Sequence, residues 1–240
     1  MMSDIAAVTV DLDDTLFDQR AWLDGAWQAV ASAGSAFGLE PTTLLAALRR
    51  IAAEGSDRGK IIDRALLAVG VPEWELAALV PGLVGAFRSH APTTLPCFPG
   101  VAEALADVRR LIPVGCVTDG DPHIQRAKLR ALGLRDVFDV VVYSDELGRE
   151  HRKPSPVPFR HALAALGVPP EHAVHIGDRP GKDVAGARAA GMRAIRVYTG
   201  EYAGQPDDPE PWRAFPDAGA ALRWLVRQLA GVPAGSRLAD

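Results

Sequence analysis

The sequence contains little cysteine and no long apolar run. Its two cysteines, Cys97 and Cys116, form neither a CxxC pair nor a spacing typical of metal ligands. Neither cysteine is therefore expected to have a redox role, and a reducing compartment is the simpler interpretation. A helix needs about 20 apolar residues to cross a bilayer, and no stretch approaches this length. We therefore expect no membrane segment.

A strong charge of one sign is also absent. The formal net charge is −4, which gives no electrostatic support for a nucleic-acid partner. The opening residues, MMSDIAAVTV, are too short and too acidic for a secretory signal. These features predict a cytoplasmic protein, and nothing in the pattern of residues indicates an oligomeric state.

The hydrophobic content of 48% is sufficient for a sizeable core. Apolar runs that end abruptly in polar residues occupy 5–11, 112–119, 139–145, 172–178 and 193–199. Segments with helical spacing occupy 101–111, 122–133, 156–167 and 183–191. Continuous apolar runs are typical of parallel strands covered on both faces, so this alternation predicts an α/β fold with a doubly wound, Rossmann-like parallel sheet. We expect 200–219 to be a surface loop before a last helix.

The alternation is interrupted once, after the first strand. The following segments space their apolar residues at helical intervals and contain no clear strand. The proline-containing stretch TTLPCFPG, at 93–100, suits a linker back to the sheet. We therefore predict an α/β core formed by 1–17 and 96–240, with an all-helical domain inserted at 18–95.

The first apolar run ends in the acidic stretch DLDD. The carboxyl ends of the strands form the ligand crevice in an open α/β sheet. We expect the polar residues that end the runs to gather there: Asp11, Asp13, Thr118, Asp119, Ser144 and Asp178. Residues i and i+2 leave a strand on the same side, so Asp11 and Asp13 can face one site. Together with Asp178 they form an all-oxygen donor set, which favours Mg²⁺ over zinc or copper.

A magnesium site of this kind commonly binds a substrate phosphate as well. Carboxylates alone would repel that phosphate, so the site needs positive charge and N–H donors. Lys153 in HRKPSP is a candidate cation, and Thr118 with the Asp119–Gly120 turn is a candidate donor group at a helix start.

Four stretches, DLDDTL, VTDG, RKPSP and GDRPGKDVAGARAAGM, occur in this order along the chain. They resemble the four motifs of the haloacid dehalogenase superfamily, with a helical cap domain inserted after the first motif. Each motif is weak alone, whereas four in order are specific. The resemblance implies a Mg²⁺-dependent phosphatase that hydrolyses a small phosphorylated metabolite, such as a sugar phosphate, a nucleotide or flavin mononucleotide, through an aspartyl-phosphate.

The resemblance also implies catalytic roles. Asp11 would be the nucleophile that attacks phosphorus. Asp13 would protonate the leaving oxygen and then activate water, which typically contributes about 10²–10⁴-fold to the rate. Thr118 and Lys153 would hold the phosphoryl oxygens, and Lys153 would also neutralise charge around Asp11.

The metal ligands implied by the resemblance are Asp11, the backbone carbonyl of Asp13, and Asp178. Asp183 would support the metal through water or through Lys153. A helix N-cap is an alternative explanation for Asp183.

Two features depart from the family pattern. Many relatives have Asn or a small residue where Asp119 stands, so we expect this carboxylate to turn away and cap the helix that begins near Pro122. The stretch SDELGREHRKP is longer than is usual for the family, which leaves Arg152 as a rival of Lys153.

Other residues have structural explanations. We expect Asp14 to have a structural or capping role, and His175, inside a predicted strand, to be a core histidine with satisfied hydrogen bonds. Trp22, Trp27 and Trp74 lie in helical segments and are expected to pack rather than to bind a ligand.

Several other functions must be weighed against a phosphatase. Dehalogenases of the superfamily lack an acid two residues after the nucleophile, so Asp13 argues against carbon–halogen chemistry. A phosphomutase would share all four motifs. A phospho-accepting signalling module also places acids, Thr and Lys at strand ends, but it needs neither Asp13 nor a large helical insertion. A catalytically idle binding protein is disfavoured because every reactive group is present.

Overall fold

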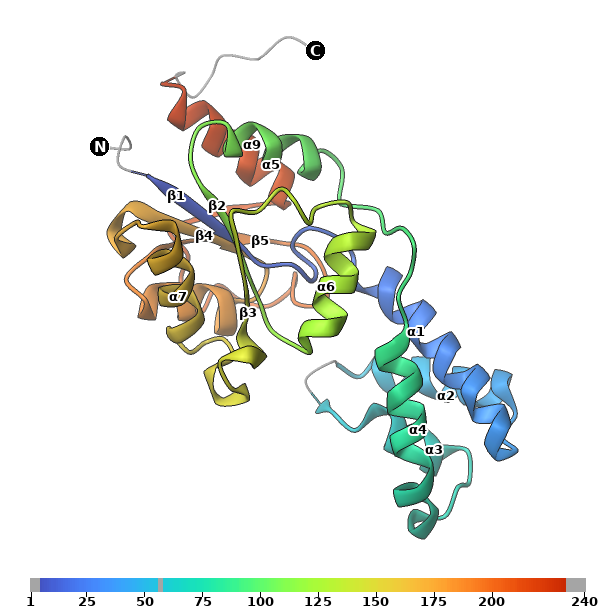
Figure 1. The fold of residues 1–240 in the computed structure, drawn as a ribbon. Helices are drawn as coiled ribbons and strands as arrows, with labels where there is room; N and C mark the ends of the chain where they lie inside the picture. The colour runs from blue at the N-terminus through green and yellow to red at the C-terminus, as the bar shows by residue number, and fades with distance from the viewer. Residues whose placement is uncertain (1–4, 56–57, 232–240) are drawn as a thin grey trace. The chain divides into compact units, whose positions relative to one another are not determined.

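The computed structural model describes residues 5–55 and 58–231. The chain divides into two compact units, which are coloured by residue number in Figure 1. One unit comprises Met1–Gln19 and Thr94–Asp240, and the other comprises Arg20–Thr93.

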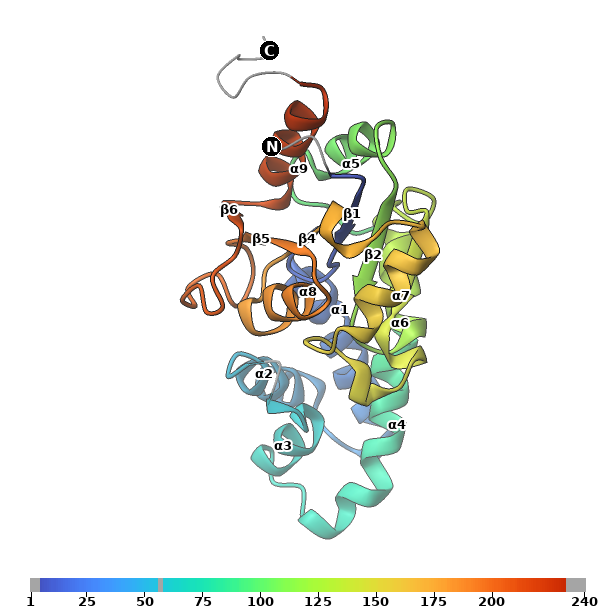
Figure 2. The same ribbon diagram turned by 90° about the vertical axis from the view of Figure 1, so that its left-hand side faces the viewer.

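The first unit is built on a six-stranded parallel sheet with the order β3-β2-β1-β4-β5-β6 (Figures 1 and 2). The strands are β1 (Ala7–Val10), β2 (Val114–Thr118), β3 (Val140–Tyr143), β4 (Ala173–Gly177), β5 (Arg193–Val197) and β6 (Arg213–Phe215). Strands β1, β2 and β4 are buried along their whole length, which explains their unbroken apolar runs. Chain order reverses at β1, so the ligand crevice is expected beyond its carboxyl end.

Helices cover both faces of this sheet, as Figure 2 shows. They are α5 (Val101–Arg109), α6 (Pro122–Ala131), α7 (Val157–Leu166), α8 (Ala185–Ala189) and α9 (Ala218–Leu229). Helices α5 and α9 pack together over one face. On the other face, Phe159 and Leu163 of α7 and Ala187 of α8 share a core with Val117 and Val142. The predicted doubly wound α/β fold is therefore confirmed.

The expectation that 200–219 is only a loop is wrong. It contains β6, which pairs in parallel with β5 through Ile195 and Arg213. This short edge strand is mostly exposed, so it needs no apolar run and gives no strand signal in the sequence. It is held by Trp224 of α9, whose ring lies 5.4 Å from that of Phe215.

The second unit is helical in the residues that the structure describes. Its helices are α1 (Gln19–Gly34), α2 (Pro41–Ala52), α3 (Ile61–Ala68) and α4 (Leu76–Ser89). Trp22 and Trp27 are buried, with ring centroids 5.1 Å and 4.8 Å from Phe87. Trp74 is 79% exposed, against expectation, because it lies in the short turn Glu73–Glu75 and not on an apolar helix face. Among the described residues, no helix is both long and apolar enough to cross a membrane.

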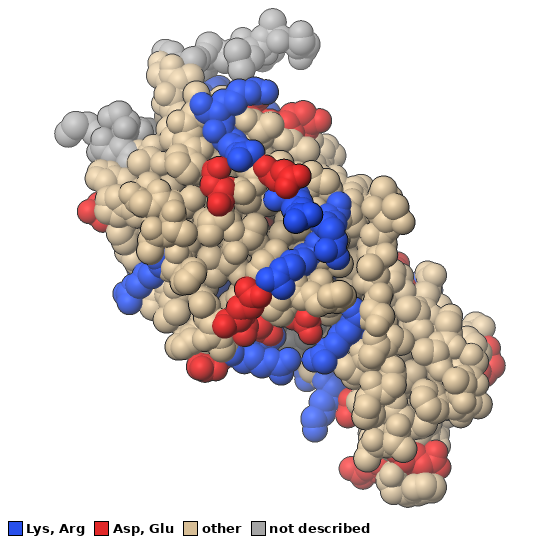
Figure 3. Space-filling view, in the orientation of Figure 1, with Lys and Arg blue, Asp and Glu red and all other residues tan. Residues whose placement is uncertain are grey.

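Acidic and basic side chains are interspersed on the face drawn in Figure 3. Exposed ion pairs include Arg109–Asp139, at 3.2 Å, and Arg126–Glu146, at 2.6 Å. Such pairs contribute little to stability because water screens them. The mixture of signs agrees with the small net charge and gives this face no continuous basic surface.

Candidate active site

The loop after β1 presents two carboxylates and buries its apolar side chains. Leu12 and Phe17 are fully buried, and the backbone N–H of Asp11 donates to Ile176 O of β4 at 2.9 Å. These contacts fix the loop against the core. Asp11 itself is 5% exposed, whereas the side chain of Asp13 is 18% exposed.

Asp14 ties this loop to the segment that follows β5. Its carboxylate accepts hydrogen bonds from Gln19 N at 2.9 Å and Glu201 N at 3.3 Å, and its carbonyl accepts one from the Thr199 hydroxyl. A Cβ at Gly200, where φ is +69°, would lie 2.2 Å from Asp14 Cβ. The close approach therefore requires glycine, and Asp14 has the structural role expected from the sequence.

Three buried carboxylates converge beyond the strand ends. Oxygen atoms of Asp11, Asp178 and Asp183 all lie within 4.8 Å of one another. Asp178 Oδ1 accepts from the Thr15 hydroxyl at 3.4 Å, and its Oδ2 has no hydrogen-bond partner within the described residues. A buried carboxylate oxygen without a partner, in an all-oxygen donor set, fits a hard divalent cation. Asp183, which the sequence predicts only to support the metal indirectly, is itself part of this cluster of carboxylates.

Lys153 provides the cation at the centre of this cluster. It is 5% exposed, and its ammonium donates to Asp11, to Asp183 Oδ1 at 2.7 Å and to Val117 O at 3.4 Å. All three ammonium hydrogens can therefore be satisfied without water. The cation offsets part of the repulsion between the acids.

The rival cation, Arg152, points elsewhere. It makes a two-pronged ion pair with Asp145, whose Oδ2 lies 2.6 Å from Arg152 Nη2. The N–H of Gly120 also donates to this carboxylate, and these contacts hold the pKa of Asp145 below its ordinary value, Arg152 being the main cause. The Gly120 N–H, a candidate substrate donor in the sequence, thus has a protein acceptor here.

Asp119 does not cap α6 as expected. Its Oδ1 accepts from the Ser144 hydroxyl at 2.7 Å and from Lys153 N at 3.1 Å. The N-cap of α6 is Asp121, which accepts from His123 N at 2.9 Å. The prediction was wrong because Asp121, and not Asp119, immediately precedes the first residue of α6 and occupies the N-cap position. Asp119 instead fixes the backbone at Lys153.

Burial and neighbouring charges set the protonation of the acids. Burial raises the pKa of Asp11 to about 7 against the opposing effect of Lys153, and Asp183 adds to the rise. Burial, with Asp183 and Asp11, also raises the pKa of Asp178 well above its ordinary value. Burial acts in the same direction on Asp183, but Lys153 and His175 outweigh it and lower its pKa. Further positive charge is therefore needed to keep Asp11 and Asp178 ionised together at neutral pH.

His175 on β4 forms a hydrogen bond with Asp183. Its Nδ1 lies 2.9 Å from the Thr9 hydroxyl and its Nε2 lies 3.3 Å from Asp183 Oδ1. The ring is fully buried against Phe159, and burial lowers its pKa, so it is neutral at neutral pH. The tautomer that satisfies both contacts donates from Nε2 to Asp183. His175 is thus the satisfied core histidine expected from the sequence.

The carboxylate of Asp13 is bound by two residues that the sequence analysis missed. Lys128 Nζ lies 2.6 Å from Asp13 Oδ1, and Gln125 Nε2 lies 2.7 Å from Asp13 Oδ2. The same Nε2 lies 2.6 Å from Thr118 Oγ1. Positions i and i+3 share one face of a helix, so the spacing of Gln125 and Lys128 just after VTDG was the available signal. The metal-ligand role predicted for the Asp13 carbonyl stays a prediction.

Comparison with known proteins adds to this geometry. The family model of the haloacid dehalogenase-like hydrolases matches residues 5–191. The chain belongs to this family. The hydrolase is 36% identical over 214 residues to a glyceraldehyde 3-phosphate phosphatase from Methanopyrus kandleri, covering 86% of this chain and 88% of the relative. It is 32% identical over 197 residues to a phosphoglycolate phosphatase from Chromobacterium violaceum, covering 82% and 86%.

A solved structure shares the fold of the hydrolase. The crystal structure of a 2-haloacid dehalogenase from Pseudomonas syringae superimposes with a TM-score of 0.64 at 28% identity, covering 93% of this chain and 99% of that one. The family resemblance carried by the four motifs is therefore confirmed. Because a dehalogenase shares this fold, the fold alone does not define the reaction, which depends on the residues of the site.

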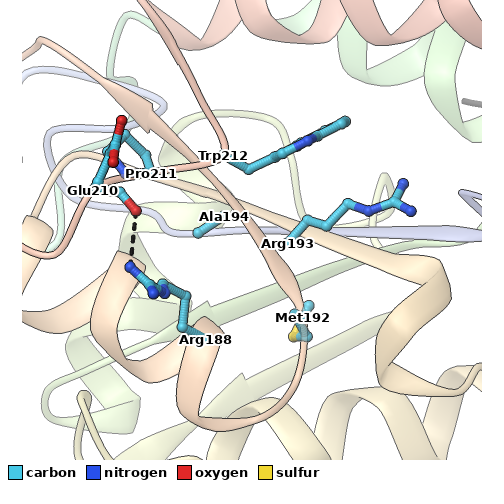
Figure 4. Close-up of a pocket in the computed structure, with 7 residues that line it drawn as sticks. All are labelled: Arg188, Met192, Arg193, Ala194, Glu210, Pro211 and Trp212. Atoms are coloured by element: carbon cyan, nitrogen blue, oxygen red, sulfur yellow. Dashed lines mark hydrogen bonds between the residues drawn. The ribbon is translucent and has the colours of Figure 1, made fainter.

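A separate pocket of the hydrolase, of about 310 Å³, lies near the start of β5 and not beyond the strand ends (Figure 4). Its lining residues are Arg188, Met192, Arg193, Ala194, Glu210, Pro211 and Trp212. Figure 4 shows the Arg188 guanidinium reaching the Glu210 carbonyl, at 3.0 Å. This pocket has a single carboxylate in its lining and is distinct from the acid cluster.

The close fit of Asp183 against Gly177 leads to the first prediction. A Cβ at Gly177 would lie 2.4 Å from Asp183 Cγ, and Asp183 cannot move without losing Lys153 and His175. We expect Gly177→Ala to lower the hydrolytic rate about 10²-fold, as small displacements of reacting groups do, and stability by about 1–3 kcal/mol. Initial rates and thermal denaturation measure the two effects.

Gly181 offers a matched control in the same segment. A Cβ there would meet nothing within 4 Å, so Gly181→Ala should change stability by no more than about 0.5 kcal/mol. Equal effects of the two alanine variants would contradict the assigned contact with Asp183.

Proposed function

We propose that this hydrolase is a phosphatase that transfers the phosphoryl group of a small phosphate monoester to Asp11 and then to water. The observation that carries the proposal is the buried Lys153 ammonium, which binds both Asp11 and Asp183 beside Asp178. A carboxylate next to a fixed cation is suited to attack an anionic ester, because the cation offsets the repulsion. The phosphatase names of the relatives support the same reaction.

In the first half-reaction, a carboxylate oxygen of Asp11 forms a bond to phosphorus while the bond from phosphorus to the ester oxygen breaks. Asp13 gives its proton to that departing oxygen, which leaves as an alcohol. The charge of a loose transition state lies on the equatorial phosphoryl oxygens. Lys153 and the Thr118 hydroxyl are the groups proposed to stabilise that charge.

In the second half-reaction, Asp13 is a carboxylate and can accept a proton from water. The water oxygen bonds to phosphorus and the bond to Asp11 breaks, so inorganic phosphate leaves with Asp11 free. Asp13 is then protonated, as it was at the start. One residue therefore serves as acid and base in turn, a role worth about 10²–10⁴-fold.

We propose Mg²⁺ as the cation of the site. Asp11, Asp178 and the backbone carbonyl of Asp13 would bind it, with Asp183 close by. When bound, Mg²⁺ supplies positive charge for the acids and for the substrate phosphate. The oxygen-only donor set and the unpartnered Asp178 Oδ2 support this choice.

Magnesium is expected to stabilise the protein through Asp178. At a concentration 100 times its dissociation constant, a ligand adds about 2.7 kcal/mol to the free energy of unfolding. Asp178→Asn should abolish most of this gain. Without metal it should make the protein more stable at pH 8, because it removes a buried carboxyl group whose raised pKa lowers stability above the pKa of the unfolded chain. Thermal denaturation with Mg²⁺ or with EDTA measures both effects.

The gain from Mg²⁺ should also depend on pH. The pKa of Asp11 is about 7 without metal, so below this pH Mg²⁺ must displace a proton. The stabilisation is expected to be larger at pH 8 than at pH 5.5. Asp107→Asn, on the exposed side of α5, is the matched control, and an unchanged Mg²⁺ effect in Asp178→Asn would contradict the metal assignment.

The helical unit is proposed to be a cap domain that selects the substrate. The two named relatives act on glyceraldehyde 3-phosphate and on phosphoglycolate, so these compounds belong in a screen with sugar phosphates, nucleotides and flavin mononucleotide. We expect the highest kcat/KM for a small metabolite, because closure over a site must exclude water.

The reaction class is tested with p-nitrophenyl phosphate. We expect Mg²⁺-dependent release of phosphate that stops with EDTA, and an aspartyl-phosphate on Asp11 detected by mass spectrometry after rapid quenching. A phosphorylated protein that persists for minutes without turnover would instead indicate a phospho-accepting module. Formation of a bisphosphate from a sugar phosphate would indicate a phosphomutase.

A further inference from the structure

Helix α6 buries a lysine and a glutamine beside the proposed acid–base residue. Gln125 and Lys128 are 2% and 3% exposed. Burying a cation and an amide is unfavourable unless each finds partners. Lys128 contacts Asp13, and Gln125 contacts both Asp13 and Thr118, two residues already assigned to the reaction.

The hydrogen bonds from Gln125 and Lys128 converge on Asp13 and Thr118. Asp13 takes a hydrogen bond on each oxygen, from Lys128 on Oδ1 and from Gln125 on Oδ2, which fixes the plane of its carboxylate. The Gln125 amide has two hydrogens. One can go to Asp13 and the other to Thr118 Oγ1.

This arrangement also orients the Thr118 hydroxyl. When Oγ1 accepts the hydrogen of Gln125, its own hydrogen is available to a different acceptor. A phosphoryl oxygen is such an acceptor. Gln125 therefore contacts both Asp13, which is proposed to move the proton, and Thr118, which is proposed to hold the phosphate.

We propose that Gln125 and Lys128 are positioning residues that hold Asp13 for proton transfer and turn the Thr118 hydroxyl toward the substrate. The inference rests on the proposed phosphatase activity and names residues outside the four motifs. If it holds, removing either residue slows the steps in which Asp13 moves a proton. Steps in which Asp13 moves no proton keep their rate.

The choice of leaving group separates these steps. Nitrophenolate departs without a proton, so phosphorylation of Asp11 by p-nitrophenyl phosphate does not need Asp13 as an acid. Dephosphorylation needs Asp13 as a base whatever the first substrate was. An alkyl phosphate needs Asp13 in both steps.

The test uses Lys128→Met and Gln125→Met in the full-length protein with Mg²⁺. With p-nitrophenyl phosphate, we expect a burst of about one nitrophenolate per active site at the wild-type rate, followed by turnover about 10- to 100-fold slower, the scale of loss for misplaced catalytic groups. With an alkyl phosphate, single-turnover phosphorylation should slow by a similar factor. Asp13→Asn should show the same pattern more strongly.

Arg130→Met is the matched control, because Arg130 is an exposed cation on the same helix. It should show wild-type rates and no burst. A purely structural role for Lys128 would lower the melting temperature and leave the dependence on leaving group unchanged, which would overturn the proposal. If Lys128→Met does not fold, the same measurements on Gln125→Met test the proposal.

Other outcomes are also decisive. Wild-type turnover by both methionine variants with both substrates would overturn the inference while leaving the phosphatase proposal intact, as would a loss confined to KM. Failure of the wild-type protein to hydrolyse any phosphate ester would instead remove the proposed function, and the inference with it.

Discussion

Asp11→Asn is expected to lower kcat/KM for phosphate esters by about 10⁴-fold or more, because it removes the attacking carboxylate without changing the shape of the side chain. No aspartyl-phosphate should form. Lys153 keeps its hydrogen bond to Asp183 in this variant, so the cation stays in place. Steady-state kinetics with p-nitrophenyl phosphate and mass spectrometry of quenched samples measure the two effects.

The same variant should fold normally. Burial raises the pKa of Asp11 to about 7, so the folded protein binds a proton there that the unfolded chain releases near pH 4. The contribution of Asp11 to the free energy of unfolding therefore falls as the pH rises from about 4 to 7. At pH 8 and without metal, Asp11→Asn should be at least as stable as the wild type. Substantial activity in a well-folded variant would falsify the role of Asp11.

Lys153→Met is expected to have the largest effect on stability. The buried ammonium contacts Asp11, Asp183 and Val117 O. Removing one partner of a buried ion pair costs about 3–5 kcal/mol, because it leaves an uncompensated charge. Hydrolysis should also fall by about 10³-fold or more, since the variant lacks the charge that stabilises the phosphoryl oxygens.

The loss of stability in Lys153→Met should depend on pH in a defined direction. Lys153 is a main reason why the pKa of Asp183 is lowered despite burial. Without it, the acids become protonated as the pH falls and no longer need a cation. Chemical denaturation should therefore show a larger loss at pH 8 than at pH 5.

Lys182→Met is the matched control for this experiment. Its side chain is 27% exposed and its Nζ lies 3.6 Å from Asp119 Oδ2. We expect a change of no more than about 1 kcal/mol at both pH values, as for other ion pairs near the surface. Equal losses in the two lysine variants would mean that burial in the acid cluster is not what makes Lys153 important.

The fold and the strand-end residues were predictable from the sequence for a simple reason. Strands buried on both faces need continuous apolar runs, and the ends of those runs identify Asp11, Thr118 and Asp178. The convergence of Asp11 and Asp178 follows because parallel strands end at one edge of the sheet. The edge strand β6 was not predictable, since an exposed strand of three residues needs no apolar pattern.

Residues in turns and on helices required the tertiary structure. Arg152 and Lys153 are adjacent in an irregular segment, where spacing does not fix which side chain points inward. Contacts with Asp145 and Asp11 decide between them. Asp183 joins the acid cluster because its turn folds back, with Oδ2 accepting from Arg179 N at 3.0 Å.

By itself, the sequence determined the five strands with apolar runs, β1 to β5, the order of the motifs and the acids at the strand ends, because apolar periodicity and strand ends are local properties of the chain. Tertiary structure alone decided which helix face meets those acids. The rotation of α6 depends on packing of the whole core, and it brings Gln125 and Lys128 to Asp13 across more than 100 residues of sequence.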